Sequence, residues 1–128
     1  AERERKMSQR AQQMKSILKD LVTNTPDVEG AAMVSVDGLV IASVLPAGTD
    51  EDRVSAMAAA LLSLGERSVG ELQRGTLGQV YVKGAEGYIV LMQAGTETVL
   101  EVITGSGAKL GMVLLDAKRS ALQLSKLA

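Results

Sequence analysis

An Asp37-Gly38 dipeptide between two apolar β-rich runs is the feature that most constrains the fold. The runs are Gly30–Val36 and Leu39–Leu45. Asp-Gly readily adopts the positive φ angles of a two-residue turn, so the pattern predicts a tight antiparallel hairpin. Such a turn places Val36 opposite Leu39, Val34 opposite Ile41 and Met33 opposite Ala42, and opposed residues share a face of the sheet.

Both faces of this predicted hairpin are apolar. One face carries Val34, Val36, Leu39 and Ile41, and the other carries Ala31, Met33, Val40, Ala42 and Val44. An antiparallel sheet with one solvated face alternates apolar and polar residues instead. We therefore expect helices to cover the sheet on both sides.

Three segments have the apolar spacing of such helices. The first runs from Met14 to Val22 and ends before Pro26. The central one follows Thr49, the predicted N-cap, and continues toward Leu72, with the carboxylates of residues 50–52 near its positive end. The last runs from Leu110 to Leu124, after a glycine-containing turn.

Three further strands are predicted between the second and third helices. The runs are Leu77–Lys83, Tyr88–Gln93 and Thr98–Thr104, and their short connections favour a meander. The first run alternates polar and apolar residues, which is typical of an edge strand or of a strand that meets another chain. The element order predicts an α+β domain over residues 14–128, preceded by a charged tail or helix extension at 1–13.

Composition excludes many functions. The chain has neither Cys nor His, so it offers no disulfide, zinc site, thiol nucleophile or imidazole base. With 14 basic and 15 acidic residues and only two aromatic ones, we expect no nucleic-acid partner. No apolar stretch reaches the roughly 18 residues of a membrane span, and the charged first residues do not read as a secretory signal. We expect a cytoplasmic protein without metal or cofactor.

Three motifs suggest chemistry but have simpler interpretations. Gly105, Gly107 and Gly111 miss the spacing of a dinucleotide loop by one residue, and no strand follows to complete a βαβ unit. The consecutive carboxylates of residues 50–52 diverge around a helix, so capping explains them better than metal binding or acid-base catalysis. Ser106 with Lys109 lacks any oxyanion or pocket signature. We therefore do not expect catalysis by this chain alone.

The central helix carries more apolar surface than one-sided burial requires. Val54, Met57, Ala58, Leu61 and either Leu64 or Gly65 form one stripe, and small or apolar residues continue around the helix. Either the helix is buried within a compact monomer, or two copies pack their central helices together and pair their edge strands. For the second alternative the predicted dimer interface consists of Ala56, Ala59, Ala60, Ser63, Gln79 and Tyr81.

The element order and several motifs together resemble the roadblock / dynein light chain family, in particular its bacterial and archaeal branch. The motifs are the hairpin Val36–Ile41, the helix Met57–Arg67, the strand Gly87–Val90 and the helix Leu110–Leu115. The resemblance implies a three-layer, profilin-like sandwich with a five-stranded antiparallel sheet. The central helix would cover one face and the terminal helices the other, with dimerisation through the central helix and the third strand.

The resemblance also implies a function. Family members are regulators or scaffolds rather than enzymes, often for small Ras-like GTPases, and the gliding-motility regulator of the bacterial branch activates GTP hydrolysis. It repositions the GTPase's own residues, so neither Arg53, Arg67 nor Arg74 is assigned as an arginine finger. We expect the partner surface to include Arg53, Glu66, Arg67 and Glu71.

Two other functions remain open at this point. The protein could be a scaffold of a motor, polarity or signalling complex, whose binding is indifferent to the nucleotide state of any GTPase. It could also be a small-molecule sensor, although the sequence shows no convergent set of polar residues around an apolar pocket.

Overall fold

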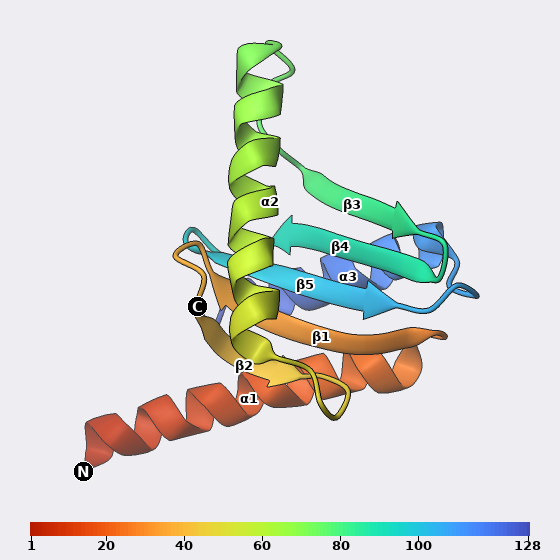
Figure 1. Cartoon of the computed structure of the whole chain (residues 1–128). Coiled ribbons are helices and arrows are strands. Elements are labelled where there is room, and N and C mark those ends of the chain that lie inside the picture. Colours follow the sequence, from red (N-terminus) through yellow and green to blue (C-terminus); the bar gives the residue numbers. More distant parts are fainter.

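The chain folds into three layers, with a sheet between two layers of helices. The computed structural model describes residues 1–128. Its elements are α1 (Glu2–Asn24), β1 (Val28–Ser35), β2 (Val40–Val44), α2 (Glu51–Glu71), β3 (Gln79–Gly84), β4 (Gly87–Gln93), β5 (Thr98–Thr104) and α3 (Leu110–Ser125). Helix α2 crosses one face of the sheet, and α1 and α3 lie on the other (Figure 1). The predicted α+β sandwich and element order are confirmed.

The five strands form one antiparallel sheet in the order β2-β1-β5-β4-β3. Strands β3, β4 and β5 are the predicted meander, and β5 closes the sheet by pairing with β1. Strand β3 lies at one edge, as its half-polar pattern predicts. Its outer edge therefore retains unpaired backbone groups.

The β1–β2 hairpin is present, but its predicted register is wrong near the turn. Met33 lies opposite Ala42 as expected, whereas Val34 pairs with Val40 and not with Ile41, because a bulge intervenes. The Ser35 N–H donates a backbone hydrogen bond to the Leu39 carbonyl, and the Gly38 N–H donates one to the Ser35 carbonyl. These bonds close a three-residue loop, residues 36–38, with Gly38 at φ 88°. The extra residue moves Val40 to the α2 side and leaves Ile41 exposed on the α1 side.

The larger core lies between the sheet and the α1/α3 layer. Fifteen buried hydrophobic residues form one cluster there, including Leu18 of α1, Leu100 of β5 and Leu124 of α3, all fully buried. The Thr25 hydroxyl donates a hydrogen bond of 2.8 Å to Asp116 and ties the end of α1 to α3. Two helices thus cover this face of the sheet.

A smaller core lies under α2. Six buried hydrophobic residues form it, with Ala58 and Leu62 from the helix. Gly65 permits the close approach of α2 to β3, since a Cβ atom there would lie 2.9 Å from a methyl group of Val80. Beyond this point the C-terminal end of α2 projects past the β3 edge of the sheet (Figure 1).

Helix α1 begins at Glu2, so residues 2–13 form a helix extension, one of the two predicted alternatives, and their side chains are exposed. One predicted helix start is wrong. The N-cap of α2 is Asp50, which accepts a hydrogen bond of 3.2 Å from the Arg53 N–H. The Thr49 hydroxyl instead donates to the Pro46 carbonyl. None of the three helices is long and apolar enough to span a bilayer.

Candidate partner-binding surface

Helix α2 presents one side to the sheet and the other to solvent. Val54, Ala58 and Leu62 recur at i, i+4 and i+8 and are buried against the sheet. Arg53, Arg67 and Glu71 are exposed. At about 100° per residue these three share the solvent side of the helix, roughly half a turn away from the buried stripe.

Three of the four residues predicted for a partner surface are therefore brought together. The Arg67 guanidinium lies 3.7 Å from the Glu71 carboxylate, one turn further along, and both side chains are exposed. Glu66 is also exposed, but it lies about 100° around the helix from Arg67 and faces a flank of α2. The outer side of α2 thus mixes charges of both signs, which favours a specific protein partner over a simple polyanion.

Large apolar residues are exposed along one flank and the projecting end of α2. Met57 is 50% exposed, Leu64 60% and Leu72 69%. The predicted stripe had placed Met57 and Leu64 with Val54 and Ala58. They lie nearly a third of a turn around the helix from that line, and Ala32, Val34 and Val99 of the sheet are buried without them. An apolar flank that the monomer does not bury indicates an interaction surface.

The six residues predicted for a dimer interface fall into two places. Ala56, Ala60 and Ser63 are exposed on α2, and Gln79 and Tyr81 are exposed on the β3 edge. Ala59 is half-buried, because Gly38 of the β1–β2 turn lies close to it. A Cβ atom added at Gly38 would be 3.7 Å from the Ala59 Cβ atom. The turn thus covers part of the small-residue flank, and the flank with Met57 and Leu64 is the more open one.

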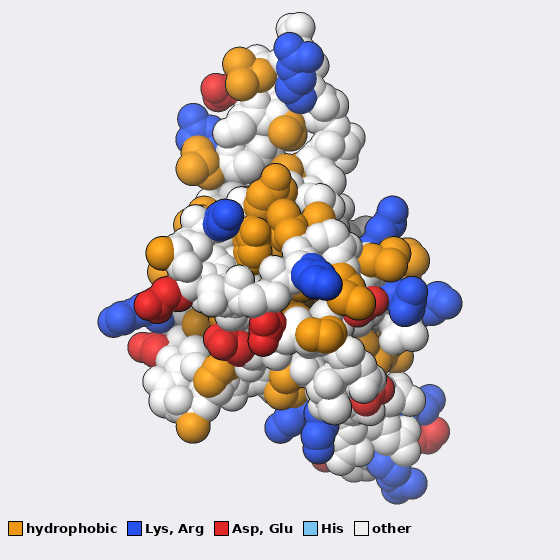
Figure 2. Space-filling view, turned by 90° about the vertical axis from the view of Figure 1, so that its right-hand side faces the viewer, with side chains coloured by type: hydrophobic (Ala, Val, Ile, Leu, Met, Phe, Trp, Pro, Cys, Tyr) orange, Lys and Arg blue, Asp and Glu red, His pale blue; other side chains and the backbone are white.

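The sheet itself is uncovered beside α2. Val82 of β3, Ile89 of β4 and Ile103 of β5 stand in one row across three strands, and all three are at least partly exposed. With the adjacent β3–β4 turn they line a shallow depression. Figure 2 shows hydrophobic side chains gathered in the middle of the corresponding end of the molecule, below the projecting end of α2. Sequence reasoning missed this row, because it assumed that α2 covers the whole face.

Glu101 lies on the same face of the sheet, in the neighbouring row. It pairs in register with Ala32 and Leu91, which belong to the core under α2. Only 3% of the residue is exposed, and its Oε1 atom has no hydrogen-bond partner. Burial raises the pKa of this carboxyl from 4.5 to about 7. Sequence reasoning missed Glu101, although apolar Val99 and Ile103 two residues away on either side indicated a buried face.

The glycine-rich turn before α3 is filled by carboxylates. The site of a Cβ atom at Gly107 is occupied by the Asp27 carboxylate, and that at Gly105 lies 2.9 Å from the Glu29 carboxylate. The Gly105 N–H donates to the Asp27 carbonyl. Acidic groups at this position would repel a phosphate, so the structure supports a plain strand-to-helix turn. The structure contains no cluster of three or more potential metal ligands.

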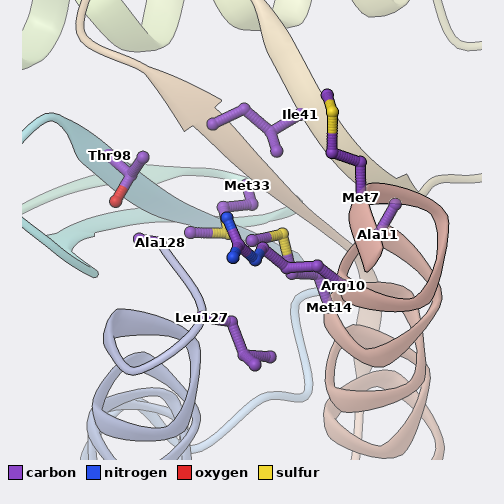
Figure 3. A pocket seen from close by; sticks show the side chains of 9 residues that line it. All are labelled: Met7, Arg10, Ala11, Met14, Met33, Ile41, Thr98, Leu127 and Ala128. Carbon is purple, nitrogen blue, oxygen red and sulfur yellow. The ribbon is translucent and has the colours of Figure 1, made fainter. Parts of the chain in front are cut away.

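One apolar groove opens on the α1 side of the sheet. Its volume is about 330 Å³, and seven of its nine lining residues are hydrophobic, among them Met7, Met14 and Leu127. Figure 3 shows the Arg10 side chain reaching from α1 toward Ala128 at the end of the chain. Arg10 and Thr98 are the only polar lining residues. Polar groups do not converge here as they do in a specific small-molecule site.

The fold and this surface define a small α/β/α module, with one face left open beside its central helix. Residues 14–104 match the Roadblock/LC7 domain, and the chain belongs to this family. An uncharacterized protein of Methanocaldococcus jannaschii is 38% identical over 100 residues, which cover 78% of this chain and 87% of that protein.

Solved structures share the fold. The gliding protein MglB of Thermus thermophilus superposes with a TM-score of 0.83 at 18% identity and covers 93% of this chain and 90% of its own. A Roadblock/LC7 domain from Streptomyces avermitilis gives 0.81 at 24% identity, with 86% and 92% coverage. Profilin IB of Acanthamoeba castellanii gives 0.63 at 13% identity, with 88% and 96% coverage, so the architecture is profilin-like.

Proposed function

We propose that this chain forms a homodimer that binds a small Ras-like GTPase and modulates its nucleotide cycle, without catalytic residues of its own. The observation that carries the proposal is that α2 covers its face of the sheet only in part. There an exposed apolar flank, a projecting helix end and an unpaired strand edge lie together. Membership of the roadblock family, whose members often serve such GTPases, supports the choice of partner.

The dimer follows from self-complementary features. The end of α2 projects beyond β3 (Figure 1). The row of Val82, Ile89 and Ile103 is partly exposed on the same face of the sheet. A two-fold axis that relates two β3 edges would place each projecting helix end over the partner's uncovered row. Met57 and Leu64 would pack between the helices, and Gln79 and Tyr81 would lie along the paired strands. Ala56, Ala60 and Ser63 point to the outer side of α2 and Ala59 to its other flank, so these four residues would border the interface.

The GTPase would bind the outer sides of the two α2 helices. In the dimer these sides form one continuous platform, with Arg53, Arg67 and Glu71 contributed twice and Glu66 at its margin. Mixed charges on a flat surface favour specificity through complementary ion pairs. Modulation of the nucleotide cycle would then come from holding the switch segments of the GTPase in one conformation.

The dimer is tested by the molar mass in solution. We expect the wild-type chain to have twice its monomer mass at micromolar concentration in light scattering. Leu64→Glu should yield a folded monomer, because it places a charge at the centre of the interface. Leu115→Glu, at a similarly exposed leucine on α3, is the matched control and should remain dimeric. A monomeric wild-type chain would refute the dimer.

The partner is tested with the Ras-like GTPases of the organism that encodes this chain. We expect one of them to bind and its rate of GTP hydrolysis or nucleotide exchange to change. Arg67→Glu should weaken binding at least tenfold, while Lys83→Glu, with the same charge change on the β3–β4 hairpin, should not. Binding that is equal for the GTP and GDP forms would favour the alternative, a nucleotide-indifferent scaffold. Failure to bind any GTPase would refute the proposal.

A further inference from the structure

Charge is strongly segregated across the sheet. Helix α1 together with residues 109–128 holds ten Lys or Arg and four Asp or Glu, a formal charge of +6. The rest of the chain, which includes the sheet and α2, holds four basic and eleven acidic residues, a formal charge of −7. The net charge of −1 conceals this asymmetry. In Figure 2, Lys and Arg side chains line the right-hand and lower margins, and others lie at the top, at the left and in the centre.

The outer side of α3 combines basic and large apolar residues. Met112, Leu115 and Leu122 are 49%, 59% and 61% exposed, opposite the buried stripe of Val113, Ala117, Ala121 and Leu124. Lys118, Arg119 and Lys126 are exposed on the same outer side, between and beside the apolar residues. Arg119 lies 3.8 Å from Asp116, whereas neither lysine has an acidic partner. This second apolar stripe has no role in the fold.

We propose that the outer side of α3, with the basic residues of α1 beside it, docks on an anionic lipid bilayer. Exposed leucine and methionine side chains insert among the headgroups, and the interleaved lysine and arginine side chains contact the lipid phosphates. Neither helix carries an aromatic residue that could stack on a nucleic-acid base. Lys118 and Leu122 border a depression beside the start of β3. The exposed Met112 and Leu115 project from the helix, which suits a fluid surface better than a protein segment.

The orientation of this docking rests on the proposed dimer. When two sheets join at their β3 edges, both α1/α3 layers lie on one side of the continuous sheet and both α2 helices on the other. The dimer then presents two basic stripes to the bilayer at once, which strengthens binding through avidity. Its platform for the GTPase faces away from the membrane.

Vesicle flotation tests the proposal. We expect the full chain to float with vesicles of 30% phosphatidylglycerol in phosphatidylcholine, but not with pure phosphatidylcholine, and to be released as salt is raised. One lysine near an anionic surface contributes about a fivefold factor in partitioning. The double variant Lys118→Glu and Lys126→Glu should therefore bind at least tenfold more weakly. Arg74→Glu with Lys83→Glu makes the same charge change outside the α1/α3 layer and should bind like wild type.

Insertion is tested by fluorescence, because the chain contains no tryptophan. Leu115→Trp should show a blue-shifted emission on addition of the anionic vesicles, whereas Leu39→Trp, at an exposed residue of the β1–β2 turn, should not. Equal binding to neutral vesicles, no binding at all, or unchanged binding by the Lys118→Glu and Lys126→Glu variant would overturn the proposal. Binding of polyglutamate but not of vesicles would identify an acidic protein site instead and would also overturn it.

The two proposals fail separately. The monomeric Leu64→Glu variant should still bind anionic vesicles, but more weakly than the dimer, and Arg67→Glu should lose the GTPase and keep the vesicles. If the wild-type chain binds vesicles but forms no dimer, only the proposed orientation of a dimer on the membrane is refuted. If the chain forms a dimer that binds the GTPase but no vesicles, only the membrane docking is refuted.

Discussion

The two sides of the sheet are built differently. On the α1/α3 side, two helices enclose fifteen buried hydrophobic residues. On the α2 side, one helix covers six, beside a buried carboxylate and a row of uncovered apolar residues. A core of the first kind stabilises a monomer by itself, whereas the second kind leaves apolar surface in water. The difference indicates that the α1/α3 side maintains the fold and that the α2 side is available for association.

The largest expected effect tests this difference directly. Leu100→Ala removes a fully buried side chain from the larger core and should lower the free energy of unfolding by about 3–5 kcal/mol. Leu62→Ala, the matched truncation under α2, should cost about 2–3 kcal/mol, because the thin layer can relax around the cavity. Urea denaturation at low protein concentration measures both. A greater loss for Leu62→Ala would show that the α2 side is the main core.

A smaller effect concerns the pH dependence of stability. In the unfolded chain Glu101 titrates near 4.5, and in the folded chain near 7. Between these values the unfolded state releases the proton and the folded state retains it. The free energy of unfolding therefore falls as pH rises from about 4.5 to about 7, by up to about 3 kcal/mol, and then levels off.

Glu101→Gln removes this titration. Denaturant curves from pH 4.5 to 8 should show a decline for the wild-type chain that the variant lacks. Glu86→Gln, in the exposed β3–β4 turn, should keep the wild-type profile. Parallel profiles for wild type and Glu101→Gln would show that the carboxyl is solvated, and that the α2 side is looser than the structure describes.

The sequence predicted the arrangement of elements better than their local details. Periodicity and the apolar hairpin faces were sufficient for the three layers, the meander and the β3 edge. The bulge was missed because the hairpin has a three-residue loop, in which the Ser35 hydroxyl accepts a hydrogen bond from the Leu39 N–H, and no hydropathy pattern reveals such a loop. Glu101 was missed because a charged residue within a strand normally indicates a solvated face.

The surface of α2 was predicted only in part. Helical spacing was sufficient to group Arg53, Arg67 and Glu71, since their relative angles follow from residue number. It was insufficient to show which flank remains open, because that depends on where the β1–β2 turn contacts the helix at Gly38. The contact joins residues that are distant in the sequence, and a single sequence does not encode it in any periodic signal.

The α2 N-cap gives an effect of intermediate size. Asp50→Ala removes the acceptor for the Arg53 N–H and should lower the free energy of unfolding by about 1 kcal/mol. Asp50→Asn keeps an acceptor at the same position and should cost less than half as much. Thermal denaturation at pH 7 compares the two. If Thr49→Ala proves more costly than Asp50→Ala, the cap lies at Thr49 after all.

The smallest expected effect separates the two halves of α2. Gly70 lies on the projecting half, with no atom within 4 Å of a Cβ position, and Gly65 lies against Val80 and Leu77. Gly70→Ala should stabilise the monomer by a few tenths of a kcal/mol to about 1 kcal/mol, because alanine favours the helix. Gly65→Ala gains the same propensity but must push α2 away from β3, and we expect it to lower stability by about 1 kcal/mol. Equal stabilisation by both variants in urea would show that α2 does not pack tightly on β3. The half of α2 at Gly65 would then be as loosely packed as the projecting half at Gly70.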